Sequence, residues 1–426
     1  CSRVDAPPRV PARTIDTATE AGLGRTKLGC AATFSARLGP RRGRLRVFYQ
    51  GAAMTAQKRP GANDGPAREP AAPLQVRPDE GFANWLAGGG GSVAISTYQA
   101  GKLMLVGWDG QQMRLLPRQF DKPMGLDAAG DRLVLATRHE VTLFANARLL
   151  AHEYLPDKPG YYDALYLPRA TYHTNELNIH DLAISGDDLW LVNTRFSCLM
   201  GLSHDFTFVP RWRPPFVSET VPEDRCHLNG LALVDGKPKY VTALGETDSV
   251  AGWRDGKATG GLLIDVESGE IVLRGLAMPH SPRWHRDRLF LLDSGAGEML
   301  QVDPERGERT VVCRLPGYLR GLTFFGDIAL VGLCKIRETN IFGGMPVQER
   351  HAELLCGVAV VNLKTGRAEG LFEFTGGCTE IYDVRFLPGI RKPNILNLEK
   401  PELRDAVAAP DFAYWLRPDK VIEDKT

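Results

Sequence analysis

One short phrase recurs along the chain at intervals of roughly fifty residues, and each copy opens a strand-like run. The six copies are Met124-Gly-Leu, His180-Asp-Leu, Asn229-Gly-Leu, His280-Ser-Pro, Arg320-Gly-Leu and Tyr382-Asp-Val. A fixed internal period with several short strands in each repeat is typical of β-propellers, in which each repeat forms one four-stranded blade. The repeat therefore predicts an all-β fold, a six-bladed β-propeller.

The copies also share the spacing between the phrase and the next apolar run. The offset from the phrase to the leucine of a second apolar run is the same in three copies, from 124 to 133, from 180 to 189 and from 280 to 289. A short polar turn, such as Gly130-Asp131, lies between the two runs. Two apolar runs joined by a polar turn are typical of a β-hairpin, so each phrase is expected to begin the innermost strand of its blade.

The last phrase has too few residues behind it to build a blade. After Tyr382-Asp-Val the chain has only a proline-rich stretch and a polar tail. Three strand-like runs precede the first phrase, at residues 92–97, 102–107 and 112–120. Pairing these runs with the last phrase would remove an open sheet edge. We therefore expect one propeller over residues 79–397, closed by N-terminal strands that complete the last blade.

The two ends of the chain lack hydrophobic periodicity. Residues 1–53 carry ten Lys and Arg against three Asp and Glu, and residues 58–79 resemble a linker, so we expect residues 1–78 to be a disordered extension and linker. The extension is either a basic organelle transit segment or upstream sequence ahead of a start at Met54, since the apolar core of a secretory signal is absent. We expect a cytoplasmic protein, with residues 398–426 as a C-terminal tail.

Composition argues against some partners. A formal net charge of +1 gives no electrostatic basis for binding nucleic acid or an anionic membrane, and no apolar run reaches the ~18 residues that a membrane helix needs. The eight cysteines include no Cys-x-x-Cys pair, so we expect them to be mostly reduced. Cys334, Cys356 and Cys378 are evenly spaced, which fits buried positions on strands of similar length better than it fits a metal site.

Long loops are expected at one face of the propeller. Irregular stretches fall at about 155–178, 209–227, 244–260 and 334–354, which are blade connectors and loops between second and third strands. In an up-and-down blade these junctions share one face with the start of the innermost strand. Binding functions usually lie where long loops gather on a rigid scaffold.

The same face is expected to carry polar side chains around the central channel. By alternation along a strand, the first residue of each phrase should face the channel, and so should His227, two positions before Asn229. The candidate catalytic residues are His180, His227, His280, Arg320 and Tyr382. The candidate ligand-binding residues are Asn229 and, at the ends of second strands, Tyr98, Gln99, Arg138, Asn193, Arg195 and Asp293.

The three histidines allow more than one chemistry. Imidazole nitrogens suit divalent transition metals such as zinc, iron or manganese, so His180, His227 and His280 are candidate metal ligands. A metal-free polar pocket is an equal alternative, and plain structural polarity is the third. Arg320 argues against a crowded cation site and favours an anionic group, which a guanidinium binds through two hydrogen bonds.

Two acidic residues, Asp181 and Asp383, stand second in their phrases and should point away from the channel. One interpretation is that they complete or orient a metal site. The other is that they make hydrogen bonds between neighbouring blades.

Several longer motifs resemble one bacterial family. They are Ser96-Thr-Tyr-Gln-Ala-Gly-Lys-Leu103, Val192-Asn-Thr-Arg-Phe-Ser-Cys-Leu199, Glu223-Asp-Arg-Cys-His-Leu-Asn-Gly-Leu-Ala232, Thr242-Ala-Leu-Gly245 and Met278-Pro-His-Ser-Pro-Arg283. From about Phe82 to Pro393 the chain resembles a family of conserved hypothetical proteins with a domain of unknown function, which implies no activity.

A shorter motif has a more distant likeness. Leu228-Asn-Gly-Leu231 is similar to a strand of the six-bladed, calcium-dependent lactonases and gluconolactonases, which implies a calcium ligand at Asn229 alone. His180 and His280 stand where the acidic calcium ligands of those enzymes are expected. Calcium is therefore less favoured than a transition metal.

Together these patterns predict a propeller that binds a small polar or anionic molecule at the mouth of its channel. The enzyme interpretation is a metal-dependent lyase, hydrolase or oxidoreductase, in which the histidines are metal ligands or the general acid and base. The alternative is a non-catalytic recognition module that grips a peptide or protein partner at the same mouth.

Overall fold

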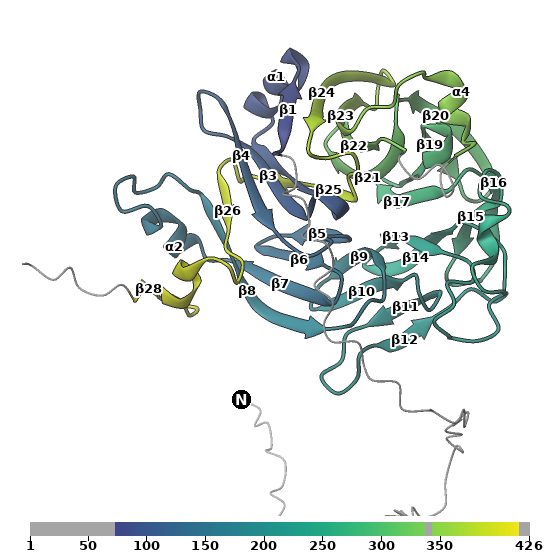
Figure 1. Ribbon diagram of the computed structural model, residues 1–426, viewed down its shortest axis with the longest axis horizontal. Helices are drawn as coiled ribbons and strands as arrows, with labels where there is room; N and C mark the ends of the chain where they lie inside the picture. Colours follow the sequence, from purple (N-terminus) through teal and green to yellow (C-terminus); the bar gives the residue numbers. More distant parts are fainter. Residues whose placement is uncertain (1–72, 337–342, 417–426) are drawn as a thin grey trace, which may run out of the picture. The chain divides into compact units, whose positions relative to one another are not determined.

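Six sheets of four or five strands form the blades of the fold (Figure 1). The computed structural model describes residues 73–336 and 343–416. The innermost strands of blades 1 to 6 are β5 (Leu126–Ala129), β9 (Ile179–Ser185), β13 (Leu228–Val234), β17 (Pro279–His285), β21 (Tyr318–Phe325) and β25 (Asp383–Pro388). Each contacts the next, and β25 contacts β5, so the ring is closed. The predicted six-bladed, all-β propeller is confirmed.

The other strands of each blade follow its innermost strand outward. Blade 1 continues with β6 (Arg132–Ala136), β7 (Glu140–Asn146) and β8 (Ala164–His173), and blade 2 with β10 (Asp188–Asn193), β11 (Cys198–Gly201) and β12 (Val209–Trp212). Blade 3 continues with β14 (Lys237–Ala243), β15 (Gly261–Asp265) and β16 (Ile271–Leu276), and blade 4 with β18 (Arg288–Asp293), β19 (Glu298–Asp303) and β20 (Glu308–Arg314). Blade 5 continues with β22 (Ile328–Cys334), β23 (Gly357–Asn362) and β24 (Arg367–Gly376).

Blade 6 joins the two ends of the propeller. Its outer strands are β2 (Gly91–Ser96), β3 (Lys102–Trp108) and β4 (Met113–Gln119), and β2 pairs with β25 over its whole length. The pairing runs from Gly91 opposite Pro388 to Ser96 opposite Asp383. The predicted closure by N-terminal strands is therefore confirmed.

Short elements cover the blade edges. Strand β1 (Gln75–Pro78) pairs with β24, although these residues were expected to belong to the linker. Helix α1 (Glu80–Gly88) follows it, capped by Asp79, whose carboxylate accepts from the Phe82 amide at 2.7 Å. Strand β26 (Pro393–Ile395) pairs in parallel with β8. The expected extension before residue 73 lies outside the described residues.

The remaining elements lie in loops and in the C-terminal segment. They are α2 (Arg148–Glu153), α4 (Pro346–Arg350), the 3₁₀ helices η1 (Tyr98–Ala100), η2 (Gly252–Arg254), η3 (Ser294–Ala296) and η4 (Pro401–Asp405), and the hairpin β27 (Ala406–Ala408) with β28 (Ala413–Trp415). The hairpin packs against α2, where the Trp415 indole donates to the Leu150 carbonyl at 3.2 Å. The described part of the expected tail is thus a packed segment. Among the described helices, none has the length and apolar character to cross a membrane.

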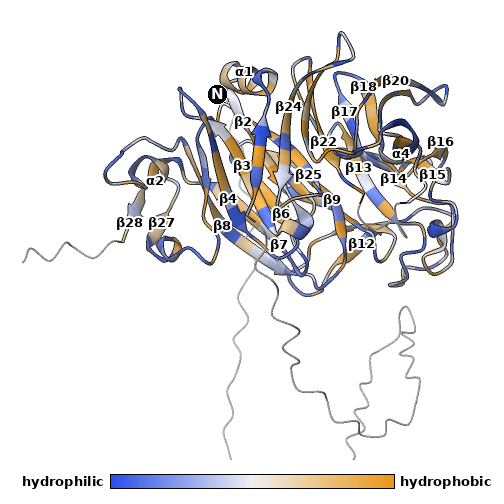
Figure 2. Ribbon diagram, turned by 45° about the horizontal axis from the view of Figure 1, so that its top comes forward, coloured by the Kyte–Doolittle hydropathy of each residue, from blue (hydrophilic) through white to orange (hydrophobic). Residues whose placement is uncertain are grey.

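The core is built from alternate strand residues that pack between adjacent sheets. Val93 and Ile95 of β2 share a cluster with Val384 of β25, and Leu133 and Leu135 of β6 belong to the next cluster round the ring. Figure 2 shows the hydrophobic strand positions in orange. The six cysteines of the described segments are buried and free, as expected, while the other two cysteines of the sequence lie outside the described residues.

Buried acidic residues at the second position of two phrases connect different blades. Asp181 of blade 2 accepts from the Leu231 amide of blade 3 at 3.0 Å and from Arg283 of blade 4 at 2.7 Å. Asp383 of blade 6 accepts from the Leu126 amide of blade 1 at 3.3 Å. Of the two interpretations of these aspartates, hydrogen bonding between blades is the one that the structure shows.

Candidate functional site

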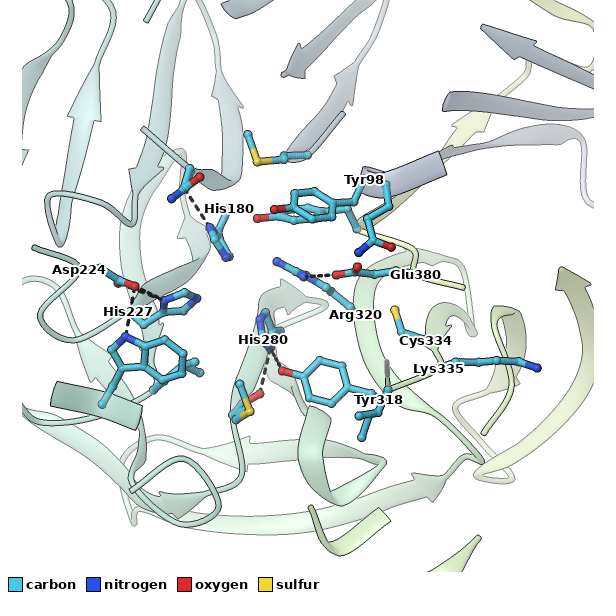
Figure 3. Close-up of a pocket in the computed structure, with 18 of the residues that line it drawn as sticks. Tyr98, His180, Asp224, His227, His280, Tyr318, Arg320, Cys334, Lys335 and Glu380 are labelled. Carbon is cyan, nitrogen blue, oxygen red and sulfur yellow. Dashed lines mark hydrogen bonds and ion pairs between the residues drawn. The ribbon is translucent and has the colours of Figure 1, made fainter. Parts of the chain in front are cut away.

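Side chains from all six blades enclose a cavity of about 240 Å³ at the mouth of the central channel. Because a water molecule occupies about 30 Å³ of the liquid, the cavity has room for a small organic molecule. Its lining is formed by Tyr98, Gln99, Met124, Asn178, His180, Asp224, His227, Leu244, Trp253, Arg254, Met278, His280, Tyr318, Arg320, Cys334, Lys335, Ile336, Glu380 and Tyr382. Figure 3 shows His180, His227, His280 and Arg320 pointing toward one central space.

His180, at the start of β9, has its Nδ1 atom hydrogen-bonded within the protein. Nδ1 lies 2.9 Å from the Asn178 carbonyl oxygen and 2.8 Å from Oγ1 of Thr194. The Thr194 hydroxyl donates to the Leu228 carbonyl at 2.6 Å, so its oxygen is left to accept from the ring. Because a carbonyl only accepts, Nδ1 carries the hydrogen, and Nε2 of the neutral ring keeps a lone pair.

His280 repeats this arrangement two blades further on. Its Nδ1 lies 2.9 Å from the Met278 carbonyl and 3.0 Å from Oγ of Ser294. Each histidine has its carbonyl partner two positions earlier and its hydroxyl partner fourteen positions later. The phenol of Tyr318 adds a third contact, 3.4 Å from Nδ1 of His280. The repeat thus fixes the same tautomer at both rings.

A left-handed backbone precedes the innermost strand in four blades. Lys122, Asn178, His227 and Met278 have φ values of +50°, +53°, +51° and +52°. This conformation costs a non-glycine residue about 1 kcal/mol or more, and such strain tends to collect at functional sites. At Asn178 and Met278 the strained residue supplies the carbonyl that orients an imidazole.

His227 differs from the other two histidines because its partner is a carboxylate. Its Nδ1 lies 2.8 and 3.0 Å from the two carboxylate oxygens of Asp224. The Trp253 indole also donates to Asp224, at 3.2 Å, and its ring lies 4.4 Å from the imidazole, centre to centre. A carboxylate stabilises the imidazolium that forms when Nε2 takes up a proton, so this pair is suited to act as a base.

Arg320 places a positive charge inside the cavity. Its side chain is only 8% exposed, Nη1 donates to Glu380 at 3.2 Å, and the guanidinium lies 3.6 Å from the centre of the Tyr382 ring. Tyr382 is stacked on Tyr98 at 5.3 Å between ring centres. The phenol oxygen of Tyr382 is buried and has no hydrogen-bond partner among the described residues. One face and one nitrogen of the guanidinium are thus held, and its other N–H donors are available to a ligand.

Burial sets the charge state of these groups. It holds the pKa of His280 well below its ordinary value, and the charge of Arg320 adds to the effect. For His180 burial again comes first, followed by His227 and Arg320, and the pKa falls in the same direction. Burial raises the pKa of Tyr382 well above its usual range. At neutral pH the two imidazoles and the phenol are therefore uncharged beside a guanidinium cation.

Seven of the twelve candidate residues line the cavity, and three of the others are buried outside it. Asn229 occupies the position equivalent to His180, but its shorter amide accepts from the Thr242 hydroxyl at 2.6 Å. Asp293 is hydrogen-bonded to the Ala277 amide at 2.6 Å. Asn193 is fully buried and has its own hydrogen bonds within blade 2. Asn229, the one calcium ligand that the lactonase likeness implied, is therefore not at the cavity.

The remaining two candidates, Arg138 and Arg195, lie near the cavity rather than in it. Both contact Glu176, at 3.4 and 3.9 Å, and Lys122 contacts the same carboxylate at 3.1 Å. The Lys122 ammonium lies 5.2 Å from the centre of the ring of Tyr98, which lines the cavity. Arg138 is also paired with Asp121 at 2.9 Å, so three cations face two carboxylates and leave one excess positive charge on this side of the mouth.

Several lining residues were missed by the sequence analysis. They are Asn178, Asp224, Trp253, Arg254, Tyr318, Lys335 and Glu380. Asn178, Tyr318 and Glu380 stand two positions before a phrase, the same offset that identified His227, so applying that rule to every copy would have found them. Asp224, Trp253, Arg254 and Lys335 come from long loops, where no period marks individual positions.

A metal ion at this site would have to be held by several side chains together. In residues 73–336 and 343–416, no group of three or more His, Cys, Asp or Glu side chains is arranged to hold one ion. The guanidinium of Arg320 lowers the pKa of His180 and His280, as a neighbouring cation does. The three-histidine metal site thus stays a prediction.

The cavity brings together the parts needed for acid–base chemistry on an anion. His227 with Asp224 can take up a proton, and Arg320 can neutralise a carboxylate or the negative charge that develops on proton removal. Tyr382, with its uncharged and unpartnered phenol, can donate a hydrogen bond to the same molecule.

Comparisons with known proteins identify a family. None of the curated proteins matches the chain. Among solved structures, the chain is similar to one titled "Crystal structure of Nidogen/Laminin Complex", with a TM-score of 0.46 and 12% identity over 70% of this chain and 99% of that chain. A likeness at this level carries no functional information. The family described as "Domain of unknown function (DUF4915)" matches residues 80–396, which confirms the resemblance seen in the motifs, and the chain belongs to this family.

Proposed function

We propose that the cavity binds a small molecule through a carboxylate group and that Arg320 is the residue that recognises it. The carrying observation is a guanidinium that is only 8% exposed, faces a cavity and has just one hydrogen bond, from Nη1 to Glu380, among the described residues. A carboxylate accepts two parallel hydrogen bonds from a guanidinium, and the attraction is stronger in a site that excludes water. The cations around Glu176 add to the positive potential at the mouth.

Acid–base catalysis on this molecule is part of the proposal. A base beside a guanidinium is the arrangement that removes a proton from the carbon next to a carboxylate, because the guanidinium stabilises the charge that results. His227, held by Asp224, would be this base. Among lyase, hydrolase and oxidoreductase activities, lyase chemistry makes the most direct use of these groups.

Calorimetric titration with sugar acids tests the proposal. The probes are D-glucuronate, D-galacturonate and D-gluconate, with D-glucose as the uncharged comparison. We expect at least one acid to bind at least about tenfold more tightly than glucose, since a charge-assisted hydrogen bond contributes about 1.5–3 kcal/mol. Arg320→Ala should abolish the preference, Arg320→Lys should retain part of it, and the exposed Arg132→Ala is the matched control. If wild-type protein binds none of the acids, the proposal is overturned.

A metal-dependent enzyme is the second candidate, favoured by the hydrogen bonds at Nδ1. Histidines that bind a metal through Nε2 usually donate Nδ1–H to a carbonyl or carboxylate, as His180, His227 and His280 do. Metal analysis of the purified protein distinguishes the candidates. A stoichiometric amount of zinc, iron or manganese that is lost in His180→Ala would favour the second, and the absence of metal would favour the first.

The third candidate function of the cavity mouth is the recognition of a peptide or a protein. It predicts that none of the acids binds and that Arg320→Ala weakens a protein complex instead. The titrations above therefore separate it from the small-molecule site.

A further inference from the structure

We infer that the ligand of this cavity is a hydroxycarboxylate, that is, a carboxylate with hydroxyl groups on its other carbons. The inference rests on the proposed function, because it takes the carboxylate at Arg320 as given. It adds a second recognition element, the two hydrogen-bond acceptors that His180 and His280 present to the cavity.

The direction of the Nδ1 hydrogen bonds determines which nitrogen of each imidazole can accept a hydrogen bond from a ligand. At both histidines Nδ1 donates to a backbone carbonyl at 2.9 Å, from Asn178 or from Met278. Nε2 of each neutral ring is then an acceptor with no hydrogen of its own. In the described part of the chain neither Nε2 atom has a hydrogen-bond partner, and both rings line the cavity. A ligand that satisfies them must supply hydrogen-bond donors.

The positions of the two histidines require more than one hydrogen-bond donor on the ligand. His180 belongs to blade 2 and His280 to blade 4, with blade 3 between them, and Figure 3 shows the two rings on different sides of the space before Arg320. Donors on two separate atoms of the ligand are needed to reach both. A ligand with several hydroxyls on neighbouring carbons meets this requirement.

The charge of Arg320 favours hydroxyl donors over ammonium donors. An ammonium would stand close to the guanidinium of Arg320, whereas a hydroxyl is uncharged and is not repelled. A hydroxyl also accepts a hydrogen bond, and the buried phenol of Tyr382 has no partner to donate to among the described residues. The Tyr382 ring lies 5.3 Å from the His180 ring, centre to centre, so the phenol and this imidazole are neighbours in the cavity wall.

The same two imidazole nitrogens disfavour further anionic groups on the ligand. Carboxylate and phosphate oxygens are acceptors, and they would leave both imidazole nitrogens unpaired in a buried site. A second anionic group on the ligand is therefore disfavoured at the histidines. This points to a monoanionic sugar acid rather than to a dicarboxylate or a sugar phosphate.

Calorimetry with three matched compounds tests the inference. D-Glucuronate has the ring, the carboxylate and the hydroxyls, cyclohexanecarboxylate lacks the hydroxyls, and D-glucose lacks the carboxylate. We expect wild-type protein to bind glucuronate at least about tenfold more tightly than cyclohexanecarboxylate, because buried acceptors left unpaired disfavour the second compound. His180→Phe should reduce this ratio severalfold, and the exposed histidine variant His204→Phe is the matched control.

Two further measurements keep the result interpretable. Tyr382→Phe removes one hydroxyl without opening a cavity, and it should reduce the same ratio even where His180→Phe fails to fold. L-Serine and L-glycerate differ only in an ammonium and a hydroxyl next to the carboxylate, and glycerate should bind more tightly.

The outcomes separate the inference from the proposed function. If glucuronate and cyclohexanecarboxylate bind equally well, the hydroxyl requirement is wrong while the carboxylate site stands. If serine binds more tightly than glycerate, the donors are ammonium groups and the inference is overturned. If neither acid binds, both the inference and the proposed function fall.

Discussion

The guanidinium of Arg320 lies 3.6 Å from the centre of the Tyr382 ring, so the charged group that we assign to ligand recognition rests on an aromatic face. A buried contact of this kind contributes up to about 2 kcal/mol. The ring contacts one face of the guanidinium, so the N–H groups at the edge of the guanidinium stay available to the ligand.

Replacing Tyr382 should therefore separate the effect of the ring from that of the hydroxyl. Tyr382→Leu removes the aromatic face, and we expect affinity for D-glucuronate to fall by up to about thirtyfold. Tyr382→Phe keeps the face, so the affinity for cyclohexanecarboxylate should be unchanged. Isothermal titration of both variants is the measurement. Equal losses in the two variants for both acids would show that the ring contact with Arg320 is unimportant.

Asp293 should make stability depend on pH. Burial raises the pKa of its carboxyl to about 7, far above the ordinary value, although the Ala277 amide opposes the shift. The folded state thus holds the proton more tightly than the unfolded state, so the stabilisation is present below pH ~4 and is lost as the pH rises toward 7.

Asp293→Asn removes this titration and keeps an oxygen for the Ala277 amide. We expect the free energy of unfolding of wild-type protein to fall between pH 5 and pH 8 more than that of the variant, by about 1.4 kcal/mol for each unit of pKa shift at most. Urea denaturation at the two pH values measures the difference. Parallel pH profiles for the two proteins would contradict the prediction.

Asp181 and Asp187 each lie at the same distance from an arginine, but we expect them to contribute differently to the free energy of unfolding. Asp181 lies 2.7 Å from Arg283 with its side chain 4% exposed, and Asp187 lies 2.7 Å from Arg132 with its side chain 96% exposed. Asp181→Ala removes the nearest carboxylate of Arg283, which keeps Asp383 only at 3.8 Å, and should lower the free energy of unfolding by about 3–5 kcal/mol.

Asp187→Ala is the matched control and should change stability by less than about 1 kcal/mol, because solvent screens an exposed pair. Guanidinium denaturation of both variants gives the comparison. A small effect of Asp181→Ala would mean that the blades are held together without this hydrogen bonding.

The thiols of the propeller should be unreactive in the folded protein. Burial raises the pKa of Cys198, Cys226 and Cys313 to about 12, and a thiol of high pKa is rarely in its reactive thiolate form. In a Cys1→Ser/Cys30→Ser variant, an aromatic disulfide reagent at pH 8 should detect the six remaining thiols only after urea is added. Rapid reaction without urea of any of the five thiols other than Cys334, which lines the cavity, would show that a blade opens on the timescale of the assay.

The fold could be predicted because its signal is repeated. The six phrases share one register, and the strands ahead of Met124 complete the count, so closure of blade 6 follows from the sequence. Strands β1 and β26 were not predicted, because each has only three or four residues and pairs with a strand far away in the sequence. Such short edge strands have too few positions for a period to be visible.

The site could be predicted in part, for the same reason. His180, His280 and Arg320 were found because they begin phrases, and His227 because it precedes one by two positions. Asn229 was expected at the channel because it begins a phrase. Its side chain is shorter than that of histidine and is hydrogen-bonded to Thr242, and it does not line the cavity.

The groups that give the histidines different roles lie outside the repeat. Asp224 comes from a connector and Trp253 from a loop, so only the folded chain brings them to His227. The sequence repeat thus identifies which residues surround the channel, whereas the packing of the loops determines which groups those residues contact.

The pairing of β2 with β25 also bears on how the protein is made. A ribosome releases residues 91–96 early in synthesis, and their partners 383–388 are among the last of the propeller to emerge. Until then blade 6 lacks its innermost strand, and the first and fifth blades each expose an uncovered flank. Because contacts so distant in sequence form slowly, assembly of the cavity should be the final, post-translational event, and a nascent chain should be unable to engage any ligand.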